Sequence, residues 1–300
     1  MRLPVNHSHR KFLETELYRR AAGARGEKRL KDRFKEFQLE EEYHILWNLS
    51  LRLGEWKVQM DGLLLTGKCA VILESKNISG KIQFDEKTDE FSRENLNGEK
   101  TIMEDPTVQL KKHIRFLTTW FKSKKIDLPV TGLVIFTAKQ CEFLSKPPGA
   151  HICKTYQMPD YLLQIVESAP LNSEHPQLSK IKRTLQTNQT PFKRIPLCSQ
   201  YHIQTEDLTT GIFCTNCNHH LMQRHKRAWI CRQCSHRDNL AHKLAIQEYF
   251  TLIDTHLTNL EFRKFCGITS RSVATRLLTQ QDLLTTGEFK GRVYQLKKKN

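Results

Sequence analysis

The sequence predicts an α/β fold, with a mixed β-sheet flanked by helices, followed by two smaller modules. Three observations carry this prediction. A long helical segment precedes three β-type runs, a second helix and a buried strand. Two C-x-x-C pairs then lie close together, and residues 241–300 combine helical periodicity with a terminal β-type hairpin. An element order of this kind is typical of layered α/β domains.

The composition is that of a soluble globular chain with two or three domains. The 300 residues are 38% hydrophobic, and the mean hydropathy is -0.56. The sequence has no run of about 18 apolar residues, so no membrane span is expected. Its N-terminus lacks the apolar segment of a secretory signal. We therefore expect a cytoplasmic protein whose cysteines are reduced.

The chain is strongly basic, with a formal net charge of +16 and a pI near 9.5. Such an excess attracts polyanions and steers association with them. The motifs described below favour nucleic acid as the partner. From charge alone, two alternatives stay open: solubility without a partner, and attraction to an acidic membrane surface.

Residues 1–167 are predicted to form the first domain. Its leading segment, residues 9–39, has a helical composition, but Gly23 and Gly26 interrupt it, so one helix or two are open. A second helix is expected to begin at Asp105-Pro106, which supplies an N-cap acid and a proline at the first helical position. The β-type runs cover residues 44–49, 56–66, 69–77, 130–137 and 151–155, and a polar ribbon covers residues 81–95.

The most informative segment is VQMDGLLLTGKCAVILESKN, residues 58–77. The Gly-Lys dipeptide between its two apolar runs predicts a two-residue type II′ turn, which fixes the register of a hairpin. In that register Asp61 lies directly opposite Glu74, with Cβ atoms about 5 Å apart. Because side chains alternate along a strand, Lys76 shares the face of these two acids.

Two facing carboxylates repel each other, and burial in apolar strands increases the cost unless a cation lies between them. Asp61 and Glu74 are therefore candidate ligands of Mg²⁺ or Mn²⁺, which accept hard oxygen donors. A metal so held activates water and stabilises charge on a phosphate. Lys76 is placed to orient or deprotonate that water. The alternative is a solvated surface hairpin, which the surrounding apolar runs disfavour.

The pattern D-x(12)-E-S-K resembles the motif of the PD-(D/E)xK nucleases, whose fold is restriction-endonuclease-like. With GARGEKRLKDRF before it and DPTVQLKKHIRFL after it, the segment resembles the nuclease-related domain, NERD. The resemblance implies an auxiliary metal-site acid at Glu27 and a polar active-site residue at Gln109. Each has an alternative interpretation as a solvated helix residue. The implied catalytic set is Asp61, Glu74, Lys76, Glu27 and Gln109.

Residues 168–205 are predicted to be a linker with one helix near 177–187. Residues 206–240 then hold the spacing C-x2-C-x13-C-x2-C, which resembles a zinc ribbon. Four thiolates close a tetrahedral Zn²⁺ site with no open position, so this zinc is expected to be structural. The histidines nearby are interpreted as polar surface, and Trp229 as either a nucleic-acid contact or the small core. The expected ligands are Cys214, Cys217, Cys231 and Cys234.

Residues 241–300 resemble a winged helix: helix, short helix, turn, helix and hairpin. In such a module the third helix lies on the DNA, and the wing lies near phosphates. The alternative is a small helical packing or dimerisation domain. The residues expected on the DNA side are Arg271, Ser272, Thr275 and Arg276 on the helix, with Lys290 and Arg292 on the wing.

The leading hypothesis is a Mg²⁺-dependent phosphodiesterase that acts on DNA and holds it with the zinc ribbon and winged helix. A non-catalytic DNA-binding regulator and an RNA-processing enzyme are the alternatives. No membrane partner is expected. Formation of a homodimer is left open, because nucleases with one site often pair to cut both strands.

Overall fold

The computed structural model describes residues 2–170, 177–190 and 195–297, except for the side chain of Lys290. Contacts divide the chain into two compact units. We call residues 15–192 the sheet unit, and residues 1–14 with 193–300 the cysteine unit. Residues 2–14 therefore group with the C-terminal region. Among the described residues, no helix has both the length and the apolar character needed to cross a membrane.

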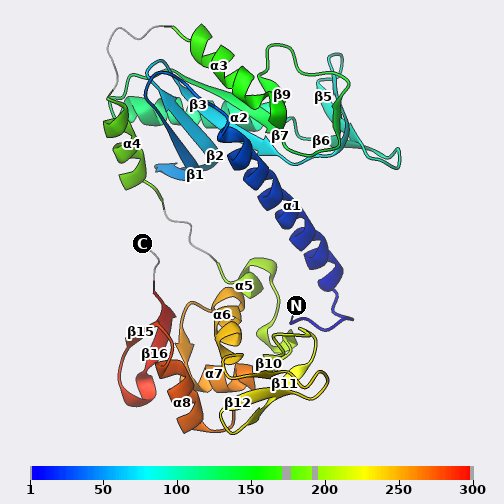
Figure 1. Cartoon of the computed structure of the whole chain (residues 1–300), viewed down its shortest axis with the longest axis vertical. Coiled ribbons are helices and arrows are strands. Elements are labelled where there is room, and N and C mark those ends of the chain that lie inside the picture. Colours follow the sequence, from blue (N-terminus) through cyan, green and yellow to red (C-terminus); the bar gives the residue numbers. More distant parts are fainter. Residues whose placement is uncertain (1, 171–176, 191–194, 298–300) are drawn as a thin grey trace. The chain divides into compact units, whose positions relative to one another are not determined.

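Helix α1 runs without a break from Arg10 to Phe34 (Figure 1). Gly23 and Gly26 therefore do not divide it into two helices. Gly26 is buried, and a Cβ added there would lie 2.5 Å from Oγ1 of Thr137 and 2.9 Å from Cβ of Asn77. This glycine lets the helix approach the sheet closely, which is a packing role and not a helix break.

A mixed five-stranded sheet forms the centre of the sheet unit, in the order β1-β2-β3-β7-β9. The first three strands are antiparallel, whereas β7 and β9 extend the sheet in parallel with β3. The apolar runs in the sequence match these strands, because a strand covered on both faces needs apolar residues at nearly every position. The strand bounds are Tyr43–Leu53, Trp56–Thr66, Ala70–Lys76, Val130–Phe136 and Ile152–Lys154.

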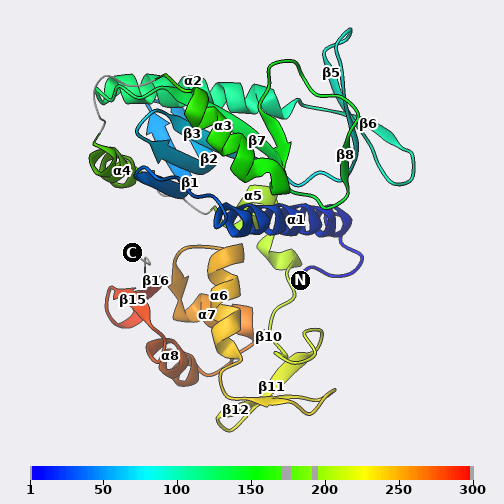
Figure 2. The same cartoon turned by 45° about the horizontal axis from the view of Figure 1, so that its top comes forward.

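Helices cover both faces of this sheet (Figures 1 and 2). Helix α2, Pro106–Ser123, begins at the predicted cap, where Asp105 accepts a hydrogen bond from the backbone N–H of Thr107. Its apolar side shares one core with α4, Leu178–Thr187. The opposite face is covered by α1 and by α3, Met158–Ser168. The sequence analysis did not predict α3, which follows a short 3-10 turn.

A second sheet of four strands packs beside the first, in the order β6-β5-β4-β8. It contains the polar ribbon expected at residues 81–95, whose alternate side chains Ile82, Phe84 and Phe91 are buried in the same core as α2. The sheet therefore has one apolar and one solvent-facing side. Its strands are Gly80–Asp85, Glu90–Glu94, Lys100–Met103 and Cys141–Phe143 for β4, β5, β6 and β8.

The cysteine unit contains two small sheets around four helices, α5 to α8, which share one core with the N-terminal Leu3. Arg2 is buried in this core, where its Nη2 lies 2.6 Å from Oε2 of Glu248. The helices are Leu197–Tyr201, His242–Leu252, Asn259–Cys266 and Arg271–Thr279. The strands β10 to β16 are Ile212–Phe213, Leu221–His225, Ala228–Cys231, Arg237–Asp238, Leu257–Thr258, Leu283–Thr286 and Val293–Leu296.

Candidate functional site

The hairpin of β2 and β3 has the predicted register, with Gly62 paired to Leu73 and Leu65 paired to Ala70. The predicted type II′ turn is wrong, because Gly67 is not among the residues with a positive φ. The side chain of Thr66 closes the turn instead: its Oγ1 accepts hydrogen bonds from the backbone N–H groups of the two residues Lys68 and Cys69.

The β2–β3 ladder ends at Gly62 and Leu73, one pair before Asp61 and Glu74. The β1–β2 ladder also skips Asp61, whose expected partner Asn48 has a φ of 53°. At this point the alternation shifts phase, because Met60 and Leu63, three residues apart, both face the core beneath α2. Asp61 thus lies at an irregularity in the sheet. There the backbone N–H of Ser75 donates to the Asp61 carboxylate, in place of a backbone carbonyl on β2.

The side chain of Asp61 joins the two strands beyond the ladder. Its Oδ2 accepts hydrogen bonds from the backbone N–H of Ser75, at 2.9 Å, and from the Ser75 hydroxyl, at 2.7 Å. Because one carboxylate oxygen takes both bonds, the other oxygen has lone pairs for a further ligand. The geometry holds Asp61 beside the end of β3, where Glu74 and Lys76 lie.

Glu74 is 3% exposed and lies between the Lys76 ammonium and the His113 imidazole. Its Oε1 is 2.9 Å from Nζ of Lys76, and its Oε2 is 3.5 Å from Nδ1 of the buried His113. The ammonium of Lys76 also donates a 2.7 Å hydrogen bond to Oε1 of Gln109. The predicted polar residue on α2 therefore does contact the predicted lysine.

The pKa values of the two central acids shift in opposite directions. Burial raises the pKa of Asp61, and the negative charge of Glu74 raises it further, against the hydrogen bonds from Ser75 and the charge of Lys76. Burial also favours the neutral form of Glu74, but His113 and Lys76 outweigh this and hold its pKa below the ordinary value. The two carboxyl groups interact electrostatically, as groups on one site do.

Glu27 on α1 belongs to the same electrostatic group. Burial raises its pKa, the charge of Asp61 raises it further, and Lys31 opposes the shift. The positive charges of Lys76 and Lys31 therefore do not outweigh burial and carboxylate repulsion at Asp61 and Glu27, whereas the neighbours of Glu74 do. An added divalent cation beside these two acids would relieve their repulsion, which is the chemistry expected of a metal site.

This carboxylate group is open and not a closed cage. Within residues 2–170, 177–190 and 195–297, only the four cysteines bring three or more ligand atoms of His, Cys, Asp or Glu within 4.8 Å of one another. An ion at the acids would take few protein ligands, leaving positions for water and phosphate oxygens.

Sequence reasoning missed two residues of this group, His113 and Ser75. His113 follows Gln109 by four residues, so both lie on the same side of α2, and this spacing was a usable signal. Ser75 lies between the two recognised motif residues Glu74 and Lys76, but its bond to Asp61 depends on the end of the ladder. No sequence pattern marks that end.

The comparisons with known proteins concern this same segment. Residues 22–137 match the family model described as "Nuclease-related domain", NERD. The chain contains a nuclease-related domain. The matched range includes all the residues of the carboxylate group, from Glu27 on α1 to His113 on α2. No curated protein and no solved structure matches the chain.

Outside the nuclease-related domain, the four cysteines converge as predicted from their spacing. The Sγ atoms of Cys214 and Cys234 are 3.6 Å apart, and those of Cys217 and Cys231 are 3.8 Å apart. Sulfur atoms that share one tetrahedral Zn²⁺ lie about 3.8 Å from one another, given Zn–S bonds near 2.3 Å. The separations therefore fit a tetrahedral metal site.

The two cysteine pairs are built alike. Asn218 and Ser235, which directly follow the second cysteine of each pair, both have a left-handed backbone, with φ of 59° and 55°. Backbone N–H groups then point at the sulfur atoms, and those of His219 and His220 lower the pKa of Cys217 to about 5. Such donors stabilise a thiolate, which is the form that binds metal.

Trp229, on β12 of this module, is 3% exposed. Its Nε1 donates a 3.4 Å hydrogen bond to Nδ1 of the buried His242. Of the two interpretations of Trp229, the structure supports the core residue. The guanidinium of Arg224 lies 5.1 Å from the Trp229 ring centroid, and its buried Nη1 has no hydrogen-bond partner among the described residues.

Helix α8 presents the predicted polar residues around an open hollow of about 710 Å³. Arg271 and Arg276 are exposed there, and Ser272 and Thr275 line the same hollow. Burial lowers the pKa of Arg224, and the charge of Arg276 lowers it further, so these two cations lie near each other. Arg292 is partly buried, whereas the side chain of Lys290 lies outside the described part of the structure.

Proposed function

We propose that the protein is a divalent-metal-dependent nuclease that hydrolyses phosphodiester bonds of DNA, with a restriction-endonuclease-like active site. The observation that carries this proposal is the group of Asp61, Glu74 and Lys76 at the irregular end of the β2–β3 hairpin. The match of the surrounding segment to a nuclease-related domain supports it. Such a domain implies nucleic acid as the substrate.

Asp61 and Glu74 would hold Mg²⁺ or Mn²⁺, with Glu27 as an auxiliary acid. The raised pKa values of Asp61 and Glu27 support this role, because burial and the repulsion between neighbouring carboxylates both disfavour their ionised forms and a cation would relieve that repulsion. When bound, the ion supplies Lewis-acid stabilisation of charge on the phosphate. The hydrogen bonds from Ser75 fix the Asp61 carboxylate before any ion arrives, so little reorganisation is needed.

Lys76 would orient the attacking water and exchange a proton with it at Nζ. Glu74 and Gln109 hold that ammonium from two sides, which restricts it to one position. His113 would act through Glu74, whose Oε2 lies 3.5 Å from its Nδ1. Positioned proton transfer of this kind contributes roughly 10²–10⁴-fold to rates.

The cysteine unit would hold the DNA. The element order α6, β14, α7, α8, β15, β16, with the sheet order β14-β16-β15, supports a winged helix whose third helix is α8. Arg271 and Arg276 would then contact DNA from that helix, and Lys290 and Arg292 from the wing. Structural Zn²⁺ on the four cysteines would hold the ribbon that carries Arg224 beside them.

The test is cleavage of supercoiled plasmid and of linear duplex by the purified full chain with added Mg²⁺. Asp61→Ala is expected to abolish cleavage and Lys76→Ala to slow it by about 10²–10⁴-fold, while both leave the circular dichroism spectrum and DNA binding intact. Equal cleavage by all three proteins would show that the activity belongs elsewhere. Endonuclease and exonuclease action separate in the same assay, because only the former converts the closed circle.

A second candidate function is non-catalytic grip of DNA, and one observation favours it. Both oxygens of Glu74 already have nitrogen neighbours, Nζ of Lys76 and Nδ1 of His113, so a metal ion must compete with them. If DNA binding without catalysis is the function, the wild-type chain is expected to bind duplex DNA tightly and to cleave none of it with Mg²⁺, Mn²⁺ or Ca²⁺.

A further inference from the structure

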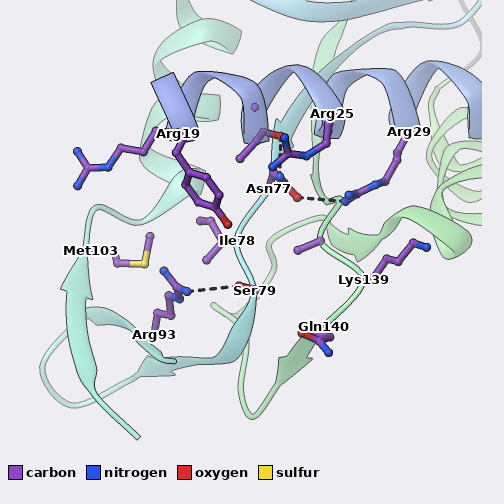
Figure 3. Close-up of a pocket in the computed structure, with 14 residues that line it drawn as sticks. Arg19, Arg25, Arg29, Asn77, Ile78, Ser79, Arg93, Met103, Lys139 and Gln140 are labelled. Carbon is purple, nitrogen blue, oxygen red and sulfur yellow. Dashed lines mark hydrogen bonds between the residues drawn. The ribbon is translucent and has the colours of Figure 1, made fainter. Parts of the chain in front are cut away.

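The sheet unit contains a cationic pocket on which none of the site assignments above depends. We call it the arginine pocket. It has a volume of about 770 Å³ and lies between α1, the segment that follows β3, the β5–β6 ribbon and the segment that follows β7 (Figure 3). Its five cationic side chains belong to Arg19, Arg25, Arg29, Arg93 and Lys139, and no Asp or Glu lines it.

Two of these cations are fixed by neutral groups. Arg29 donates to Oδ1 of Asn77 at 3.2 Å, and Arg93 donates from Nη2 to Oγ of Ser79 at 3.3 Å (Figure 3). The Nε of Arg93 is buried and has no hydrogen-bond partner among the described residues. A buried donor on a charged group is costly to leave unpaired, and an anion is the partner that satisfies it best.

Arg25 and Lys139 are exposed and line the pocket. Only Arg19 of the five cations has a recorded ion pair within the described chain, with Glu16 at 3.3 Å. Four positive charges around one hollow repel each other, so an anion with more than one charge would stabilise the pocket. Phosphate groups have this charge and accept the forked donors of arginine.

The pocket also has an aromatic and an apolar part. Tyr18 is 70% exposed, and the guanidinium of Arg25 lies 6.0 Å from its ring centroid. Ile78 and Met103 are among its apolar lining residues. A solvent-facing ring beside arginines is typical of surfaces on which an unpaired base stacks. The volume exceeds what a single inorganic phosphate needs and lies in the range of nucleotide-sized sites.

The arginine pocket adjoins the carboxylate group along the chain. Asn77, Ile78 and Ser79 line it, and they directly follow Lys76. The three residues from Lys76 to Ser79 span at most about 10 Å. The carbonyl of Lys76 also accepts a 2.8 Å hydrogen bond from the N–H of Thr137, which directly precedes Ala138 and Lys139 of the pocket lining. One polynucleotide strand can therefore reach from the pocket to the acids.

We propose that the arginine pocket binds an unpaired nucleotide of a DNA strand, with the phosphates on Arg25, Arg93 and Lys139 and the base on Tyr18. The inference rests on the proposed function for the identity of its ligand, and it deepens that function: the substrate would have a single-stranded segment beside the cleaved bond. Fully paired duplex would leave Tyr18 without a base to stack on.

The test is binding of a fluorescent ten-nucleotide oligo(dT) to the zinc-loaded full chain without added Mg²⁺, over a range of salt concentrations. All proteins carry Arg271→Ala and Arg276→Ala, which reduces binding at α8. Arg25→Ala and Lys139→Ala are each expected to weaken binding several-fold and to lower the salt slope by about 0.7, the value for one lost phosphate contact on a single strand.

Tyr18→Ala is expected to weaken binding by about tenfold, within the range for base–aromatic stacking, and to leave the salt slope unchanged. The matched control is Arg183→Ala, which removes an exposed positive charge from α4 of the same unit. It is expected to leave oligo(dT) binding near that of the parent. All the substituted side chains are exposed, so the fold is expected to persist.

Two results would overturn the inference. One is oligo(dT) binding by the Arg25, Lys139 and Tyr18 variants that equals binding by the Arg183 variant. The other is displacement of oligo(dT) by free dTMP or inorganic phosphate at equal concentration of nucleotide units, which would assign the pocket to a small anion. Failure of the nuclease proposal can be distinguished from failure of this inference. The former appears as absence of DNA cleavage by the wild-type chain, whereas the oligo(dT) assay measures binding alone.

Discussion

The two candidate metal sites of this protein differ in how much of a metal's environment the chain provides. The four cysteines bring their sulfur atoms to within 4.8 Å of one another, and backbone N–H groups lower the pKa values of Cys217 and Cys234. The acids of the nuclease-related domain do not converge in this way, and two of them have raised pKa values. A closed ligand set is suited to a structural ion. An open set of mutually repelling carboxylates is suited to an ion that also coordinates a substrate.

The comparison also shows what each site depends on. The cysteine site rests on local sequence, since each pair forms its own knuckle and the hairpin β11–β12 joins them. The carboxylate site draws on three distant segments, α1, the β2–β3 hairpin and α2. Loss of one ligand should therefore unfold the cysteine site, whereas loss of one acid should remove DNA cleavage and leave the sheet unit folded.

The largest effect is expected at the cysteines. Cys231→Ser should remove a zinc contribution of the order of 10 kcal/mol and abolish hydrogen-exchange protection across β11 and β12, while the sheet unit keeps its protection. Hydrogen exchange with mass spectrometry measures both. Cys198→Ser is the control, because Cys198 is a buried cysteine of the same unit outside the cluster. Protection that survives Cys231→Ser would contradict a structural metal.

The next largest effect concerns Lys76. Lys76→Ala should lower the rate of DNA cleavage by about 10²–10⁴-fold, because the Lys76 side chain orients the attacking water and exchanges a proton with it. Gln109→Ala leaves the lysine but removes one of its two anchors, so a smaller loss is expected. Lys111→Ala, an exposed lysine on the same helix, serves as the control in the same single-turnover assay. Equal rates for Lys76→Ala and Lys111→Ala would remove the lysine from the mechanism.

The packing of α1 against the sheet can be tested with its two glycines. Gly26→Ala should destabilise the protein by about 1–3 kcal/mol, because the new Cβ would lie 2.5 Å from Thr137 Oγ1. Gly23→Ala meets no atom within 4 Å and should instead stabilise the helix by about 0.5–1 kcal/mol. Urea unfolding curves give both values. Stabilisation by both substitutions would refute the close approach.

The smallest effect is a gain in stability at Asp61. The pKa of Asp61 is higher in the folded protein than in the unfolded chain, so ionisation of Asp61 destabilises the fold. This destabilisation is absent below the pKa of the unfolded chain and grows as the pH rises through the pKa of the folded protein. Asp61→Asn should therefore stabilise the metal-free sheet unit at pH 7, by about 0.5–2 kcal/mol, as favourable single substitutions do. The gain should vanish near pH 3. Thermal unfolding across this range checks the sign, and destabilisation at pH 7 would contradict the pKa direction.

The sequence predicted the parts of this molecule that depend on local chemistry. Apolar runs gave the central strands, Asp105-Pro106 gave the start of α2, and the hairpin register followed from one short turn. The phase shift at Asp61 was not predictable, because it arises where a side chain replaces a ladder bond. The burial of Arg2 beside Glu248 was equally inaccessible, since 246 positions separate the two residues.

Some missed features did have a signal. Helix α3 begins with a proline and an acid in its first turn, and Leu162, Ile165 and Val166 follow at helical spacing. The spacing of Gln109 and His113 likewise predicted a shared side of α2. The arginine pocket had none, because its cations come from α1, β5 and the segment after β7, which only the packed fold brings together.

The central claim is that Asp61 and Glu74 hold one divalent cation. Calorimetric titration of the zinc-loaded full chain with Mn²⁺ tests it most directly, without the need for a substrate. We predict one Mn²⁺ per chain in the wild type, with the affinity lowered at least about tenfold in both Asp61→Asn and Glu74→Gln, and unchanged in the exposed control Glu142→Gln. Wild-type affinity in all three variants would contradict the claim.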